Sequence, residues 1–508
     1  MREDILKVKL EKLNQLREFG MEAYPEKTQR TFCSVQLLEQ FDKLTAGDKL
    51  TAGDKLTAGD KLTASDQLQV QEIIIVGRVR SLRPMGGSAF AHLEDESGKM
   101  QLFLNKGNMP EELFKLFVKT VELGDFVQVS GELFLTKTEE KSLKVTNWKM
   151  LSKNLRPIPT EHFGIKDEEE LLRRRYLDLM LNPETRELFR KKNIFWQTIR
   201  NFLSRDGFLE VQNPVLEHTP GGADAEPFIT HHNALDRDFF LRISLELSLK
   251  RLLVGGYEKV FEIGRVFRNE GIDRQHLQEF DHMEFYAAYW DLQKGMEFSE
   301  KMFREVVQKV SGGSVTNYEG AVLDWEKPFP IVDYFDAFQK ETGLDLSQEI
   351  SVETLMTKAQ ELGIKYEKNY GKGRMIDTIY KKTVRLKLIQ PCFLVGHPLE
   401  VSPLAKKDPQ NPAKVLRFQV VAGTAELCNA FAELNDPIDQ RQRFEAQMAL
   451  REAGDAEAQM IDEDFVQALE YGMPPAFGFG LSERFFAFLM DKSVRECVIF
   501  PPMKDREQ

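Results

Sequence analysis

Several side chains in this sequence have types and spacings that suit the binding of a small charged molecule. The segment Asn429-Ala-Phe-Ala-Glu433 places an amide, an aromatic ring and a carboxylate at every second position, and on a β-strand such positions share one face. Glu284 and Tyr286 repeat this spacing, and Glu246 adds an acid in a segment of helical character. Carboxylates beside apolar walls suit a ligand that carries an ammonium group on an aliphatic stem.

Two arginines, Arg268 and Arg484, suit a different task. A guanidinium is planar and permanently charged, so it holds a phosphate or carboxylate by two parallel hydrogen bonds. Chemistry that moves negative charge across a triphosphate needs fixed cations of this kind. Taken singly, each could be an ordinary surface arginine beside core phenylalanines. The order of the surrounding motifs must therefore decide whether these arginines bind phosphate.

Three segments around these residues occur in a defined order. Gly207-Phe-Leu-Glu-Val-Gln-Asn-Pro-Val-Leu216 follows a predicted amphipathic helix at 184–204. Phe261-Glu-Ile-Gly-Arg-Val-Phe-Arg-Asn-Glu-Gly271 continues to Phe280-Asp-His-Met-Glu-Phe-Tyr286, and Gly478-Phe-Gly-Leu-Ser-Glu-Arg484 opens a further helical run. In order and spacing these segments resemble motifs 1, 2 and 3 of the class II aminoacyl-tRNA synthetases. The class I signatures His-Ile-Gly-His and Lys-Met-Ser-Lys-Ser are absent.

Further segments are similar to the lysyl-tRNA synthetases within that class. They are Arg173-Arg-Arg-Tyr-Leu-Asp-Leu179, Gly221-Gly-Ala-Asp-Ala-Glu-Pro-Phe228, Glu400-Val-Ser-Pro-Leu-Ala405 and Asn435-Asp-Pro-Ile-Asp439. The resemblance implies ATP-dependent activation of L-lysine to lysyl-adenylate, followed by transfer to the 3′ end of tRNA(Lys). It also implies Mg²⁺ with the ATP, and a homodimer formed through motif 1.

The resemblance also implies roles for individual residues. Arg268 would hold the α-phosphate and the substrate carboxylate, and Arg484 the γ-phosphate. The other ATP-binding positions are Glu270, His276, Phe280, which would stack on adenine, and Glu426. For lysine, Glu433 and Tyr286 would bind the side-chain ammonium with Glu284 close by, Phe431 would line the stem, Gly222 and Glu246 would hold the α-ammonium, and Asn429 the carboxylate.

The sequence departs from the family at two places. Glu426 matches a metal-ligating glutamate, but the second metal position, seven residues earlier, is usually acidic and here is Gln419. Glu426 also lies an odd number of positions from Asn429, so a bulge or turn must intervene if both face one site. In motif 3, the last glycine, Gly480, lies one residue further from Arg484 than is usual.

The elements that must position these residues predict an α+β protein. A charged helical pattern at 3–20 precedes a repeated Leu-Thr-Ala-Gly-Asp-Lys unit at 42–66, which is most simply a surface insertion within an N-terminal segment 1–71. Short β-rich runs at 72–155 suit a five-stranded barrel of the oligonucleotide-binding (OB) type. Residues 165–508 would form the catalytic domain, an antiparallel sheet flanked by helices, with a helical insertion near 332–390.

Within the barrel, Phe90 and Gln101 match positions that relatives use on the anticodon, and Arg83 lies nearby. Stacking of an unpaired base on Phe90 would contribute about 1–3 kcal/mol. The competing interpretation is that Phe90 belongs to the barrel core, because it lies within a β-rich run.

Composition limits the function classes. The formal net charge of −12 argues against a protein that coats nucleic acid, although lysines such as Lys144, Lys149 and Lys153 give the barrel a local basic stretch. There is no apolar run long enough to span a membrane, and the four cysteines are scattered, so a cytoplasmic enzyme is expected.

Three other functions remain open from the residues. An aspartyl or asparaginyl enzyme would share the barrel and motifs, but an acidic substrate would need arginine or lysine where Glu433 and Glu284 stand. A ligase that lysylates a translation factor would lack the barrel. A catalytically impaired, tRNA-binding relative would fit the departures at Gln419 and in motif 3.

Overall fold

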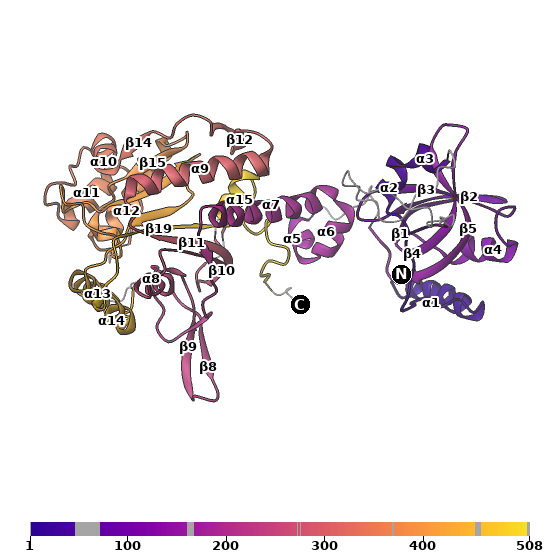
Figure 1. Ribbon diagram of the computed structural model, residues 1–508, viewed down its shortest axis with the longest axis horizontal. Coiled ribbons are helices and arrows are strands. Elements are labelled where there is room, and N and C mark those ends of the chain that lie inside the picture. Colours follow the sequence, from indigo (N-terminus) through magenta and orange to yellow (C-terminus); the bar gives the residue numbers. More distant parts are fainter. Residues whose placement is uncertain are drawn as a thin grey trace, which may run out of the picture. The chain divides into compact units, whose positions relative to one another are not determined.

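The protein is described here by a computed structural model, which covers residues 2–45, 72–159, 167–271, 273–274, 276–367, 370–452 and 459–504. The chain divides into two compact units, Met1–Gly164 and Ile165–Gln508 (Figure 1). None of the helices in these described ranges is long and apolar enough to cross a membrane.

The first unit contains a closed five-stranded barrel, in the strand order β1-β2-β3-β5-β4. Its strands are β1 (Ile73–Met85), β2 (Ser88–Glu94), β3 (Lys99–Asn105), β4 (Phe126–Leu135) and β5 (Lys141–Ser152). Alternate residues face inward, so that Ala89, Ala91 and Leu93 of β2 are fully buried. The predicted OB-type barrel is therefore confirmed.

In the described part of the first unit, four helices accompany the barrel. They are α1 (Arg2–Glu18), α2 (Ser34–Glu39), α3 (Phe41–Thr45) and α4 (Glu111–Thr120). Leu13 and Leu16 of α1 belong to the same hydrophobic core as the inward-facing barrel residues. The predicted repeat insertion lies outside the described residues from position 46 onward.

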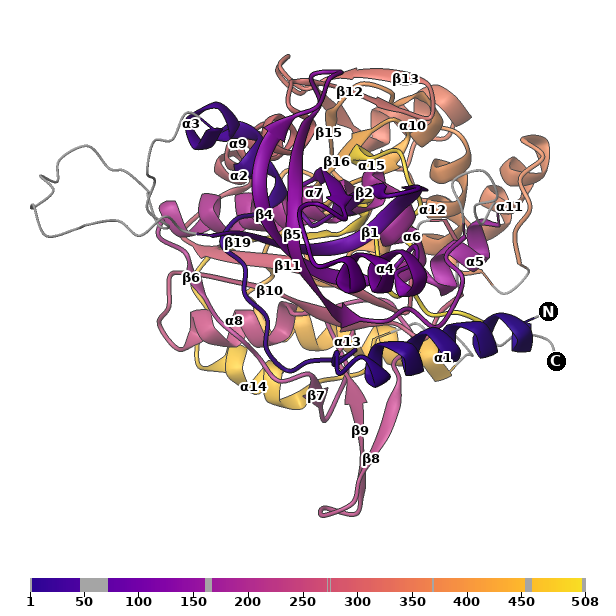
Figure 2. The same cartoon turned by 90° about the vertical axis from the view of Figure 1, so that its right-hand side faces the viewer.

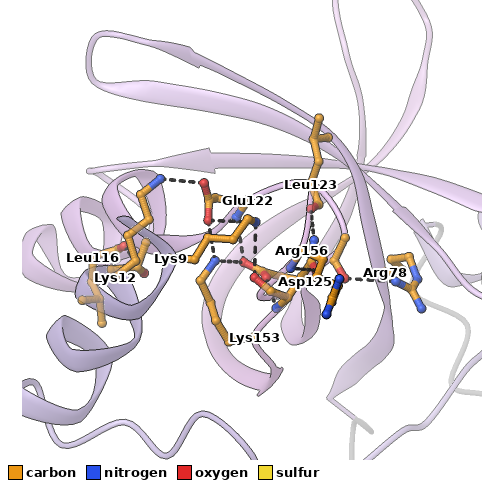
Figure 3. A network of polar contacts seen from close by, with 12 residues as sticks. Lys9, Lys12, Arg78, Leu116, Glu122, Leu123, Asp125, Lys153 and Arg156 are labelled. Carbon is orange, nitrogen blue, oxygen red and sulfur yellow. Dashed lines mark hydrogen bonds and ion pairs between the residues drawn. The ribbon is translucent and has the colours of Figure 1, made fainter. Parts of the chain in front are cut away.

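An ion-pair network joins α1 to the barrel (Figure 3). Glu122 accepts hydrogen bonds from Lys12 at 2.8 Å and from Lys153 at 2.8 Å, and Lys153 also reaches Asp125 at 2.9 Å. Burial would raise the pKa of Glu122, but the surrounding ammonium groups lower it to about 2. Lys153 is fully buried in these pairs, so it is not part of a basic surface.

The second unit is built on a mixed nine-stranded sheet, in the order β14-β15-β16-β18-β19-β11-β10-β6 with β17 paired to β16. The strands are β6 (Leu209–Glu210), β10 (Lys259–Phe267), β11 (Glu279–Ala288), β14 (Ile331–Asp333), β15 (Cys392–Val395), β16 (Arg417–Ala422), β17 (Ala425–Glu426), β18 (Asn429–Ala432) and β19 (Ala476–Ser482). The interior pairs are antiparallel, as predicted, while β6–β10 and β14–β15 at the two ends are parallel.

Helices cover this sheet. The long helices α7 (Pro183–Arg205) and α9 (Leu292–Ser311) pack side by side, and they share an aromatic core with α15 (Arg484–Leu489) and the strands. Phe285 and Phe479 stack within that core with ring centroids 5.1 Å apart. The remaining helices outside the insertion are α5 (Glu168–Arg173), α6 (Arg175–Leu181), α8 (Glu246–Val254), α13 (Pro437–Glu452) and α14 (Glu463–Glu470).

Residues 332–390 contain three helices, α10 (Tyr334–Thr342), α11 (Val352–Glu361) and α12 (Lys372–Lys382), with their own hydrophobic cluster. Two 3₁₀ turns follow, η2 (Arg385–Lys387) and η3 (Leu399–Val401). The smaller sheets consist of β7 (Leu216–Glu217), β8 (Ile229–His232) and β9 (Arg237–Leu241), and of β12 (Val315–Tyr318) and β13 (Ala321–Asp324). The β8–β9 hairpin extends away from the rest of the second unit (Figure 1, Figure 2).

Candidate active site

The floor of the candidate site consists of three adjacent strands, β18, β19 and β11. Strand pairing places Gly478 between Phe431 and Tyr286, and it places Gly480 between Asn429 and Glu284. A Cβ atom on Gly478 would collide with the Glu433 carboxylate and the Tyr286 ring. Gly478 therefore lets these two side chains pack directly against the strand, where any other residue would clash with them.

A cavity of about 300 Å³ opens above this floor. It brings together residues of motifs 2 and 3, of β16–β18 and of the segment 222–246. Those used below are Gly222, Ser244, Glu246, Arg268, Phe280, His282, Glu284, Tyr286, Arg417, Gln419, Glu426, Asn429, Phe431, Gly478, Gly480 and Arg484.

Glu284 is a buried carboxylate whose oxygens are surrounded by donors. Ser244 Oγ and the Leu245 backbone N–H donate to Oε1 at 2.9 and 3.0 Å, and Tyr286 Oη donates to Oε2 at 2.9 Å. Burial would raise the pKa of Glu284, but its contact with His282 and these hydrogen bonds lower it below the usual value. Glu284 is therefore a fixed negative charge in the cavity wall.

Glu246 begins helix α8 and pairs with Lys250 one turn later, with Nζ 2.5 Å from Oε1. Lys250 Nζ also contacts Glu433 Oε2, and the Lys250 side chain is fully buried. Burial raises the pKa of both glutamates, and Lys250 opposes this shift. Lys250 does not line the cavity, but it places an ammonium group against Glu246, which does. The sequence interpretation did not include this lysine.

Arg268 directly follows β10, Phe280 lies near the start of β11, and the two side chains lie together. The Arg268 guanidinium carbon lies 5.4 Å from the centroid of the Phe280 ring. Burial lowers the pKa of Arg268 and of Arg484, but both remain cationic because an arginine titrates far above neutral pH. Arg484 Nε has no hydrogen-bond partner among the described residues. These groups suit an anion placed beside an aromatic ring.

Glu426 and Asn429 both line the cavity because the chain breaks between β17 and β18, at Leu427 and Cys428. The odd spacing predicted this interruption. Arg417 Nε donates to Asn429 Oδ1 at 2.7 Å, which fixes the amide with its NH₂ group free to face a ligand. Arg417 was not singled out from the sequence, although it precedes Gln419 by two residues and so shares its face of β16.

Three expected site residues do not line the cavity. Glu433 lies beyond the end of β18, buried to 1 % exposure against Lys250. Glu270 and His276 belong to the loop between β10 and β11, where His276 Nδ1 contacts Asp273 Oδ2 at 2.7 Å. Arg268, Phe280, Glu284, Tyr286, Phe431 and the remaining expected positions do line it.

The predicted anticodon residues lie on the outer face of the barrel. Phe90 is half-buried and pairs across strands with Arg83 and with Phe103, whose ring centroid is 5.1 Å away. It is absent from the barrel core, so the core interpretation of Phe90 is wrong. Gln101 is buried and accepts a hydrogen bond from Ser142 Oγ at 2.7 Å, which leaves its NH₂ group as the available donor.

Comparison with known proteins agrees with this geometry. Residues 167–504 match the family described as tRNA synthetases class II (D, K and N). The chain belongs to the class II tRNA synthetase family. Residues 73–151 match the OB-fold nucleic acid binding domain, so this synthetase-family chain carries both parts of the predicted architecture.

Full-length relatives of this synthetase-family chain share one name. A lysine–tRNA ligase from Moorella thermoacetica is 43% identical over 507 residues, covering 99% of each chain. Lysine–tRNA ligases from Bacillus subtilis (40% identical, 99% of this chain and 98% of theirs) and Pediococcus pentosaceus (43%, 99% and 97%) are similarly close.

Proposed function

We propose that this chain is a lysine–tRNA ligase that activates L-lysine with ATP and transfers it to the 3′ end of tRNA(Lys). The observation that carries the proposal is the pairing of two cavity-lining carboxylates, Glu246 and Glu284, with the aromatic wall of Phe431. An acidic amino acid would face like charges there, which costs several kcal/mol, whereas a lysine side chain would meet opposite charge. The names of the full-length relatives agree.

Strand geometry supports a division of the cavity between the two substrates. Phe280 and Tyr286 lie six residues apart on β11, which corresponds to roughly 20 Å along a strand. We assign adenine to the ring of Phe280 and the phosphates to Arg268 and Arg484. The lysine side chain extends toward Tyr286 and Glu284, its α-ammonium lies near Gly222 and Glu246, and its carboxylate lies near Asn429 and Arg268.

In the first step, a lysine carboxylate oxygen attacks the α-phosphorus, the bond to the bridging oxygen breaks, and pyrophosphate leaves. Arg268 orients the carboxylate and neutralises charge on the α-phosphate, while Arg484 neutralises the leaving group. In the second step, the terminal ribose hydroxyl of the tRNA attacks the lysyl carbonyl and AMP leaves. Magnesium enters with ATP as part of the substrate, and Glu426 is the carboxylate that would contact it.

Two further assignments belong to the same proposal. The outer face of the barrel, with Phe90, Gln101 and Arg83, takes the anticodon. A second copy of the chain binds through motif 1, where Leu209, Val215 and Leu216 are exposed apolar side chains and β6 ends the sheet. A cytoplasmic location is expected for such an enzyme.

Amino-acid-dependent exchange of pyrophosphate into ATP tests this function directly. Exchange with lysine, and none with aspartate or asparagine, is the expected result. Exchange with no amino acid, while tRNA(Lys) still binds, would instead identify a tRNA-binding relative without catalytic activity.

A further inference from the structure

Gln419 joins two side chains at the wall of the cavity. It is 7 % exposed on β16, and its Nε2 donates to Glu426 Oε2 at 3.2 Å. Its Oε1 lies 3.1 Å from Nε2 of His397, a buried imidazole. Because Gln419 Oε1 is an acceptor, Nε2 is the ring nitrogen that donates in this contact.

This arrangement does not fit a divalent ion held between positions 419 and 426. Such an ion requires oxygen atoms that converge on it. Here the amide turns its N–H toward Glu426, and its oxygen is engaged by His397. Within the described residues, there is also no group of three or more His, Cys, Asp or Glu side chains arranged to hold a metal.

The chain places cations around Glu426 instead. Arg385 Nη1, from the turn η2, lies 3.4 Å from Glu426 Oε1. Arg417 and Arg484 line the same cavity as Glu426, and the charge of Glu426 favours the cationic form of each. Arg385 lies close enough to Arg484 to oppose its charge. Glu426 therefore stands among three guanidinium groups.

We propose that Arg385 is a phosphate-binding residue that takes the place of the divalent ion which a carboxylate at position 419 would help to hold. The site then takes a nucleoside triphosphate with one ion fewer than a two-carboxylate site would, and Glu426 would contact the ion that remains. The inference rests on the proposed use of ATP. A guanidinium offers fixed positive charge and directed N–H donors to phosphate oxygens. It needs no free metal, so nucleotide binding should depend less steeply on the concentration of magnesium.

The number of ions can be counted on the full-length protein with Mn²⁺ and α,β-methylene ATP, which cannot release pyrophosphate. Electron paramagnetic resonance of free Mn²⁺ gives the ions bound per nucleotide complex. The native chain is expected to bind one. The double variant Gln419→Glu/Arg385→Gln, which restores a carboxylate pair and removes the competing cation, is expected to bind one more. Two ions on the native chain, or equal numbers on both proteins, would overturn the inference.

The role of Arg385 is tested by the affinity for the same analogue at fixed Mg²⁺. Arg385→Gln should weaken binding about tenfold, as expected for loss of a charged hydrogen bond, and Arg385→Lys should recover part of it. Lys387→Gln removes an exposed cation from the same turn and should leave affinity unchanged. Equal affinities for Arg385→Gln and Lys387→Gln would contradict the proposal.

These measurements separate the inference from the proposed function, since neither requires lysine. Binding of a single ion without lysine-dependent exchange would contradict only the proposed function. Exchange with two ions bound would remove only the role of Arg385.

Discussion

Lys250 and Glu433 form an ion pair in which both side chains are fully buried. The contact involves Glu433 Oε2, while Oε1 has no hydrogen-bond partner among the described residues. Lys250 also pairs with Glu246, which lines the cavity. Glu433 therefore acts on the pocket through Lys250, and the charge that a ligand meets depends on all three groups.

Lys250→Met should destabilise the protein by about 3–5 kcal/mol at neutral pH, because it leaves two buried carboxylates without a counter-ion. Urea unfolding measures this loss. The double variant Lys250→Met/Glu433→Gln should recover much of the stability, since one uncompensated charge is gone. Arg251→Met, which removes a more exposed pair with Asp462, should cost about 1 kcal/mol or less. Similar losses for Lys250→Met and Arg251→Met would contradict the assignment.

Glu284→Gln should raise the KM for lysine by roughly a hundredfold or more and leave the KM for ATP nearly unchanged. The substitution removes the fixed charge and misplaces an amide among the donors Ser244, Leu245 and Tyr286. Pyrophosphate exchange at varied lysine and ATP gives both constants. Glu279→Gln, at the exposed start of the same strand, is the matched control. Unaltered lysine saturation in Glu284→Gln would exclude this residue from the lysine site.

Gly478→Ala should reduce lysine-dependent exchange by roughly tenfold to a hundredfold while analogue binding persists, because the added Cβ meets Glu433 and Tyr286. Gly480→Ala is a milder test, since its Cβ would lie 3.0 Å from His282 Nε2 and 3.4 Å from Glu284 Cγ. Calorimetry with lysine and with the ATP analogue distinguishes the two effects. Full lysine affinity in Gly478→Ala would show that the floor of the cavity accommodates the added methyl group.

Glu217 should make stability fall as pH rises. Burial, together with the charges of Asp462 and Glu284, raises the pKa of Glu217 to about 8 in the folded chain, against 4.5 ordinarily, although Arg242 and Arg251 oppose the shift. The folded state therefore keeps a proton that the unfolded chain releases. The contribution of this proton to the free energy of unfolding is complete below about pH 4.5 and is lost as the pH rises toward 8. The free energy of unfolding falls by no more than about 1.4 kcal/mol per pH unit in this range.

The measurement is urea unfolding of the native chain and of Glu217→Gln between pH 5 and pH 9. The glutamine variant should show a flatter dependence on pH, because its amide does not titrate. Parallel curves for the two proteins would mean that Glu217 ionises normally.

Phe90→Ala should raise the KM for tRNA(Lys) by roughly fivefold to a hundredfold in aminoacylation, which corresponds to the loss of one base stack. Lysine-dependent pyrophosphate exchange without tRNA should not change, because the site of that reaction lies in the other unit. Phe90→Tyr keeps an aromatic face and should retain most of the tRNA affinity. An unchanged KM in Phe90→Ala would show that the anticodon binds elsewhere.

The sequence was sufficient where the signal is local. Short β-rich runs predicted the barrel strands, because residues that favour strands are grouped there between turn residues. The order of the three motifs predicted the catalytic fold. The odd spacing between Glu426 and Asn429 predicted the break between β17 and β18. The strands and the break depend on residues close together in the chain, and each motif is itself a short segment.

Only the tertiary structure decided the pairing of groups from distant segments. Lys250 follows Glu246 by one helical turn, so that contact could have been expected. Its contact with Glu433 joins segments that meet only when α8 packs against the sheet. Likewise, the orientation of the Gln419 amide depends on His397 and Glu426. A side chain's type limits what it can bind, but burial and neighbouring charges determine which of those partners it has, and both arise from packing.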